Sequence, residues 1–238
     1  MEQQTCRAGG IPALLWGPRS DWGLVAVHGS QSHKADLPIQ RLAEAAAGRG
    51  WQVLSVDLPE HGDRTGSAAR CKAMTCVPEL AAVLEEARRR WTHVGLFANS
   101  LGAYFALTAW QEEPLEGAWL LAPVLDLERL IGNMLSWSGA AEDQLRQAGE
   151  LPTPLGQTLY WDDLRWIRAH PIRRWDTPTW ILRGGKDSLC GEKTAEDFSA
   201  RFGCRLQTVP DAGHDFRAPE EVGYLSRWLE ETLCQGGG

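Results

Sequence analysis

The chain has 238 residues, of which 43% are hydrophobic, and its 24 basic and 31 acidic side chains give a formal net charge of −7. This length suits one α/β domain with an insertion or two small domains, and the acidic balance argues against a nucleic-acid-binding protein. Neither a secretion signal nor an apolar run of membrane-spanning length is present in the sequence, so we expect a cytoplasmic protein without a membrane span. The six scattered cysteines contain no C-x-x-C pair, which favours free thiols over a zinc site.

Strands and helices alternate along most of the chain. We predict strands at residues 11–16, 24–27, 51–56, 92–97, 117–121, 179–183 and 205–209. Helices are predicted at residues 36–49, 78–90, 101–110, 192–202 and 219–233, followed by a frayed glycine tail at 236–238. This alternation is typical of a mostly parallel sheet covered by helices on both faces.

The segment 126–172 breaks this rhythm. It opens with apolar residues at helical spacing, continues with a stretch at 151–156 that interrupts any helix, and ends in an aromatic helix at 159–169. We therefore predict a core domain of residues 1–125 and 173–238 and a small helical lid at 126–172. Three of its aromatic residues are candidate substrate contacts, unless their rings only hold the lid to the body: Trp137, Tyr160 and Trp161.

The turn at Ala98-Asn99-Ser100-Leu101-Gly102 joins a predicted strand directly to a predicted helix. A serine in such a turn projects its hydroxyl away from the backbone, and the residues two before and two after it must be small. The amide of Leu101 would lie at the N-terminus of a helix, where it can bind an oxyanion. On these residues alone, an ordinary helix N-cap is about as good an interpretation as a catalytic serine.

A base and an acid follow the last two predicted strands. Asp187 comes after strand 179–183 and His214 after strand 205–209, so the chain order is serine, acid, histidine. Because the carboxyl ends of parallel strands meet at one edge of a sheet, these groups can converge on Ser100. Asp211 and Asp215 lie on the loop of His214 itself and are therefore poorly placed to reach behind its ring. Asp126 is a more serious alternative to Asp187 as the acid.

Across almost its whole length, the chain resembles the α/β-hydrolase fold. The matching pieces, in chain order, are His28-Gly29, Asp57-x-x-x-His61-Gly62, Ser100-x-Gly102, Gly184-x-x-Asp187 and Gly213-His214. The resemblance implies Ser100 as nucleophile, His214 as general base and acid, and Asp187 as its orienting acid. It also implies an oxyanion hole from the backbone amides of Ser30 and Leu101, and a lid that follows the sixth strand of the fold.

The His28-Gly29 pair is expected to shape the oxyanion loop rather than to react, and His61 to belong to a hydrogen-bonded loop rather than to a metal site. Gln31, beside that loop, is a candidate substrate contact. Position 98 holds alanine in place of the glycine usual in this family, and this departure does little to weaken the resemblance. The helix–turn–helix pattern of the lid is loosely similar to that of small intracellular cinnamoyl or feruloyl esterases.

We therefore expect a serine carboxylesterase acting on small acyl or aryl esters, with no metal and no organic cofactor. A thioesterase, a lipase or a peptidase would use the same three residues. From a different class, a catalytically inactive binding module on the same fold is the alternative. The sequence leaves a homodimer open.

Overall fold

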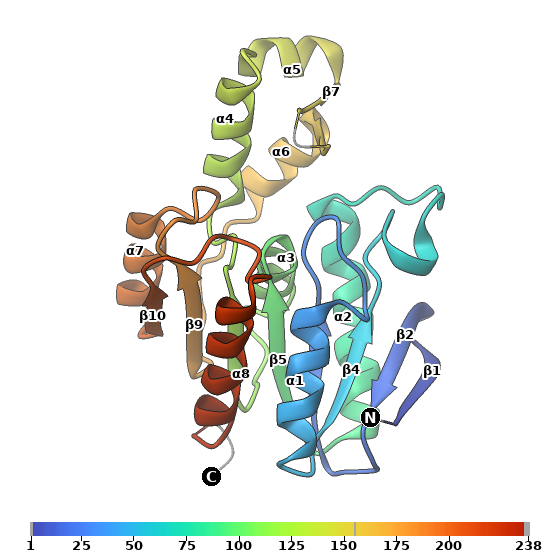
Figure 1. Cartoon of the computed structure of the whole chain (residues 1–238). Coiled ribbons are helices and arrows are strands. Elements are labelled where there is room, and N and C mark those ends of the chain that lie inside the picture. The colour runs from blue at the N-terminus through green and yellow to red at the C-terminus, as the bar shows by residue number, and fades with distance from the viewer. Residues whose placement is uncertain (1, 155, 236–238) are drawn as a thin grey trace.

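The computed structural model describes residues 2–154 and 156–235, so Leu155 and the predicted tail 236–238 lie outside the described residues. Eight strands form one sheet in the order β1-β2-β4-β3-β5-β6-β9-β10 (Figure 1). The strands are β1 (Gln3–Ala8), β2 (Ile11–Trp16), β3 (Trp22–Val27), β4 (Gln52–Val56), β5 (His93–Asn99), β6 (Ala118–Leu121), β9 (Thr179–Gly184) and β10 (Arg205–Val209). β1 pairs antiparallel with β2, and β2 with β4, whereas all other pairings are parallel.

Helices cover both faces of this sheet, as the sequence predicts. One face carries α1 (Leu37–Ala47) and α8 (Pro219–Leu233), and the other carries α2 (Ala73–Arg90), α3 (Leu101–Ala109) and α7 (Glu192–Phe202) (Figure 1). Successive residues of β3 point to opposite faces, so Leu24 packs with α1 and α8 while Val25 packs with α2 and α3. None of the helices in the described ranges is long and apolar enough to cross a membrane.

Between β6 and β9 the chain leaves the sheet and rises above the carboxyl ends of its parallel strands (Figure 1). This inserted segment contains α4 (Leu127–Trp137), α5 (Glu142–Ala148), β7 (Glu150–Pro152), β8 (Thr158–Tyr160) and α6 (Trp161–Ala169). β7 and β8 form a separate antiparallel pair. The helical spacing at the start of the segment is thus the inner face of α4, where Leu127, Leu130, Ile131, Met134 and Leu135 are buried.

Polar contacts attach the inserted segment to the body. The carboxylate of Asp163 accepts hydrogen bonds from the amides of Ala73 and Met74, each at 3.0 Å, at the first turn of α2. Next to it, Asp162 pairs with Lys72 at 2.8 Å. Gln157 Nε2 donates to Ser30 Oγ at 3.1 Å and thereby joins the segment to the loop that follows β3. The first-turn amides of a helix need acceptors, and here a side chain about 90 residues away supplies them.

This contact also explains where α2 begins. We predicted a start at Pro78, but the helix begins at Ala73 and contains Pro78. Asp163 caps the additional turn from outside the local sequence. We did not predict β1, because its residues are mostly exposed at the edge of the sheet and lack a clear apolar alternation.

We expect Asp163→Ala to lower the free energy of unfolding by about 1–2 kcal/mol, because two amides of α2 lose their acceptor. Asp162→Ala is the matched control: it removes the ion pair between Lys72 and Asp162, whose side chain is 56% exposed, and should cost less than about 1 kcal/mol. Urea denaturation followed by circular dichroism measures both changes. Equal effects of the two substitutions would contradict the capping role of Asp163.

Candidate active site

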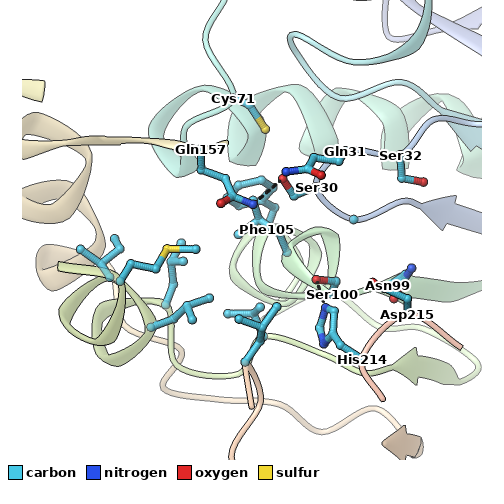
Figure 2. Close-up of a pocket in the computed structure, with 18 of the residues that line it drawn as sticks. Ser30, Gln31, Ser32, Cys71, Asn99, Ser100, Phe105, Gln157, His214 and Asp215 are labelled. Atoms are coloured by element: carbon cyan, nitrogen blue, oxygen red, sulfur yellow. Dashed lines mark hydrogen bonds between the residues drawn. The ribbon is translucent and has the colours of Figure 1, made fainter. Parts of the chain in front are cut away.

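Ser100 occupies a sharp turn between β5 and α3. Its backbone has φ +51° and ψ −122°, a strained conformation for a residue other than glycine. The Ser100 amide donates to the carbonyl of Leu121 at 3.0 Å and the Ser100 carbonyl accepts from Val124 at 3.0 Å, so β6 and the loop after it hold the turn. The serine hydroxyl is thereby lifted into the space above the sheet (Figure 2).

The turn lies in direct backbone contact with the loop after β3. A Cβ atom added at Gly102 would lie 2.2 Å from the carbonyl oxygen of His28, and one added at Gly29 would lie 2.8 Å from Ser100 Cβ. Neither position has room for a side chain. These two glycines therefore allow the loop after β3 to approach the serine.

Ser100, His214 and Asp187 form one hydrogen-bonded chain. Ser100 Oγ lies 2.7 Å from His214 Nε2, and His214 Nδ1 lies 2.8 Å from Asp187 Oδ2. The Asp187 side chain is fully buried, and its other oxygen accepts hydrogen bonds from the amides of Leu189 at 2.8 Å and Cys190 at 3.0 Å. With Nδ1 donating to this carboxylate, the lone pair of Nε2 faces the serine hydroxyl and can take its proton.

The three rival carboxylates have other positions. Asp126 Oδ1 accepts the amide of Arg129 at 2.9 Å and caps α4, while Asp211 pairs with Lys186 at 3.0 Å. Asp215 lines the cavity beside His214 instead of lying behind its ring. Asp187 is thus the carboxylate that contacts the imidazole.

Two backbone segments meet next to the serine. Leu101 is the first residue of α3, so its amide has no acceptor within the helix, and Ser30 belongs to the loop after β3. Gln31, the next residue of that loop, has φ +57°, and its amide donates to His61 Nε2 at 2.9 Å. Ser30, Gln31 and Leu101 all line the cavity that contains Ser100.

The cavity has a volume of about 350 Å³, within the range of small-ligand sites. Figure 2 shows its two parts on either side of Ser100. The apolar part lies below the inserted segment and is lined by Phe105, Val124, Leu127, Leu130, Ile131, Met134, Leu159 and Leu189. The other part is more polar: Asp36 accepts hydrogen bonds from Ser32 and Arg217, and Asp215 directly follows His214 in the chain.

The structure separates the four residues that we expected to contact substrate. Gln31 and Tyr160 line the cavity, whereas Trp137 and Trp161 are not among the described residues that line it. Trp137 is the last residue of α4 and is 51% exposed, and Trp161 packs against the hydrophobic core. Contact of these two tryptophans with a substrate therefore stays a prediction that this arrangement does not support, because an aromatic residue type does not tell which face of a helix turns inward.

The sequence analysis did not recognise the aliphatic stripe of α4 as a cavity wall, although its i, i+3, i+4, i+7 spacing was the available signal. It also missed Cys71, which lines the cavity 4.0 Å from the sulfur of Cys76. The hydrogen bond between the two sulfurs lowers the pKa of the Cys71 thiol. No local pattern in the sequence indicates this environment.

A family model described as "Alpha/beta hydrolase family" matches residues 24–223. No curated protein sequence matches the chain. Solved structures share its fold at low identity. Est1E from Butyrivibrio proteoclasticus with ferulic acid bound has a TM-score of 0.81 at 18% identity, over 98% of each chain. Mouse alpha/beta hydrolase domain-containing protein 10 has a TM-score of 0.80 at 13% identity, over 99% of each chain. Paleococcus ferrophilus monoacylglycerol lipase has a TM-score of 0.69 at 18% identity, over the full length of both chains.

We expect Gly102→Ala to lower the free energy of unfolding by about 1–3 kcal/mol, because its methyl group meets the His28 carbonyl and the backbone must shift. Gly132→Ala is the matched control. Gly132 is an exposed residue within α4, its added Cβ meets no described atom within 4 Å, and this change should stabilise the protein by about 0.5–1 kcal/mol. Thermal and chemical denaturation of both variants check the opposite signs, and a neutral Gly102→Ala would contradict the close approach.

Proposed function

The chain belongs to the alpha/beta hydrolase family, and we propose that it is a serine hydrolase that cleaves carboxylic esters of small acyl or aryl groups through an acyl-enzyme on Ser100. The observation that carries this proposal is the 2.7 Å contact between the Ser100 hydroxyl and His214 Nε2 at a strained turn. A serine hydroxyl is a weak nucleophile at neutral pH until an adjacent base takes its proton.

In the first half of the reaction, His214 Nε2 accepts the proton of Ser100 as Oγ attacks the carbonyl carbon of the ester. Asp187 keeps the imidazole in the required tautomer and stabilises the imidazolium that forms. The amides of Ser30 and Leu101 donate to the oxyanion of the tetrahedral intermediate. Collapse of this intermediate breaks the ester bond, and His214 returns the proton to the leaving alcohol.

In the second half, a water molecule takes the place of the alcohol. His214 removes a proton from this water as it attacks the acyl-enzyme, and the second tetrahedral intermediate forms in the same oxyanion hole. Its collapse releases the carboxylic acid, and the proton on His214 returns to Ser100. The same three side chains thus serve both halves.

The two parts of the cavity suit the two parts of an ester. The leaving alcohol must lie beside His214, which protonates it, and therefore in the polar part near Asp215 and Arg217. The acyl group then lies in the apolar part, below α4. In this proposal, residues 126–172 act as a lid over the core formed by residues 1–125 and 173–238. The fold shared with Est1E, whose structure contains ferulic acid, supports including aryl esters among the substrates.

Thioesters, acylglycerols and peptide amides can react with the same three residues. Rates on simple esters and on these three substrate classes, at matched acyl length, distinguish an esterase from a thioesterase, a lipase and a peptidase. An inactive binding module is the alternative of a different class. A fluorophosphonate that labels Ser100 supports the hydrolase, whereas a folded wild-type protein that resists labelling favours the binding module.

We expect Ser100→Ala to reduce the turnover of p-nitrophenyl acetate by roughly 10⁴-fold or more, because no nucleophile remains. Circular dichroism should show an intact fold, because the hydroxyl is outside the core. The visible absorbance of the released p-nitrophenolate measures the rate. Unchanged turnover would end the proposal.

We expect Asp187→Asn to reduce kcat by roughly 10³- to 10⁴-fold, because asparagine no longer holds the catalytic tautomer of His214. Asp126→Asn is the matched control and should leave kcat within about threefold, since this carboxylate caps α4. Steady-state kinetics on p-nitrophenyl acetate distinguish them. The reverse order of effects would make Asp126 the acid.

A further inference from the structure

Two histidines bridge the loop that carries Ser30 and the loop that faces it. The first loop, residues 28–31, follows β3, and the second, residues 57–61, follows β4. His28 Nε2 accepts the amide of Leu58 at 3.0 Å, and His61 Nε2 accepts the amide of Gln31 at 2.9 Å. Each ring therefore reaches from its own loop to a backbone amide of the other.

The other ring nitrogens complete the bridge within each loop. His28 Nδ1 donates to the carbonyl of Gly29 at 2.6 Å, and His61 Nδ1 donates to the carbonyl of Pro59 at 2.7 Å. An amide must donate and a carbonyl must accept, so both rings are neutral and carry their hydrogen on Nδ1. The rings lie together, with their centroids 5.2 Å apart.

These bonds orient the two peptide units on either side of Ser30. The carbonyl of Gly29 and the amide of Ser30 belong to one planar peptide and point in opposite directions, so the bond from His28 fixes the direction of the Ser30 N–H. The amide of Gln31 belongs to the next peptide, which His61 holds. With both planes fixed, Ser30 has no freedom to turn its N–H away from the reacting carbonyl.

His61 acts at the more strained of the two peptides. Gln31 has φ +57°, a conformation that is strained for a residue other than glycine and that persists only when neighbouring contacts hold it. His28 is 1% exposed and belongs to the buried base of the site, whereas His61 is partly exposed. Substitution of His61 therefore probes the loop without opening the core.

We propose that His61 is a positioning residue for ester hydrolysis: through Nε2 it holds the Gln31 amide and thereby keeps the oxyanion-binding amide of Ser30 aimed at the substrate. This role rests on the proposed function, since it acts through the oxyanion hole. It differs from a purely structural role because it concerns the charge that develops in the transition state, and so affects kcat more than KM.

A matched pair of substitutions tests this role. The terminal atoms of glutamine reach the position of Nε2, so His61→Gln keeps an oxygen acceptor for the Gln31 amide. Asparagine reaches only the position of Nδ1, so His61→Asn keeps a donor for the Pro59 carbonyl and loses the Gln31 acceptor. His93→Asn, at the far end of β5 where His93 pairs with Glu116, is the control for a histidine-to-asparagine change.

With p-nitrophenyl acetate, we expect kcat of H61N to fall by about 10- to 100-fold and its KM to stay within about threefold, since one oxyanion donor is misdirected but not deleted. H61Q should recover most of the lost rate, and H93N should match the wild type. A loss that H61Q does not reverse, or one that a matching fall in melting temperature explains, overturns the role of His61, as does an H61N enzyme of normal kcat.

Hydrogen exchange at the Gln31 amide tests the bridge independently of any hydrolytic activity. We expect slow exchange in the wild type and in H61Q, and fast exchange in H61N. If no ester is hydrolysed but this pattern appears, the proposed function fails while the bridge stands. Fast exchange of the Gln31 amide in the wild type overturns the bridge itself.

Discussion

The candidate site depends on one close approach of backbone to backbone, between the loop after β3 and the first turn of α3. Gly29 and Gly102 make it possible, since a side chain at either position would occupy the space of Ser100 or of the His28 carbonyl. The pairing of β3 with β5 brings the two segments together. Apolar layers on both faces of the sheet hold these strands, so Ser100 and the loop after β3 are held against each other by the most buried part of the molecule.

Backbone strain is concentrated at the same edge of the sheet. Five described residues other than glycine have positive φ, and all lie in the turns and loops that follow parallel strands: Gln31, Glu60, Ser100, Ala122 and Phe216. Each such conformation costs roughly 1–3 kcal/mol and needs surrounding contacts to maintain it. Ala122 and Phe216 are fully buried with α1 and α8, and the His61 bond holds Gln31. The buried core and the hydrogen-bonded loops thus offset the free-energy cost of the strained residues at this edge of the sheet.

The sequence predicts those features that depend on neighbouring residues or on a general rule of sheet topology. The ends of α7, β10 and α8 match the prediction, because a glycine follows α7 and a proline opens α8. The convergence of Ser100, Asp187 and His214 follows from the rule that parallel strands share a carboxyl edge. The start of α2 and the orientation of Trp137 could not be predicted, because both depend on how the inserted segment packs against the body.

The acceptor that Asp163 supplies to α2 has a consequence for protein engineering. In many multi-part proteins an insertion can be exchanged between homologues as a cassette, because its host completes every hydrogen bond without it. Here the first-turn amides of α2 obtain their acceptor from the inserted segment, so this segment cannot be exchanged without affecting α2. A chimera with another family member's insertion keeps this cap of α2 only if the new sequence also offers a hydrogen-bond acceptor at that point.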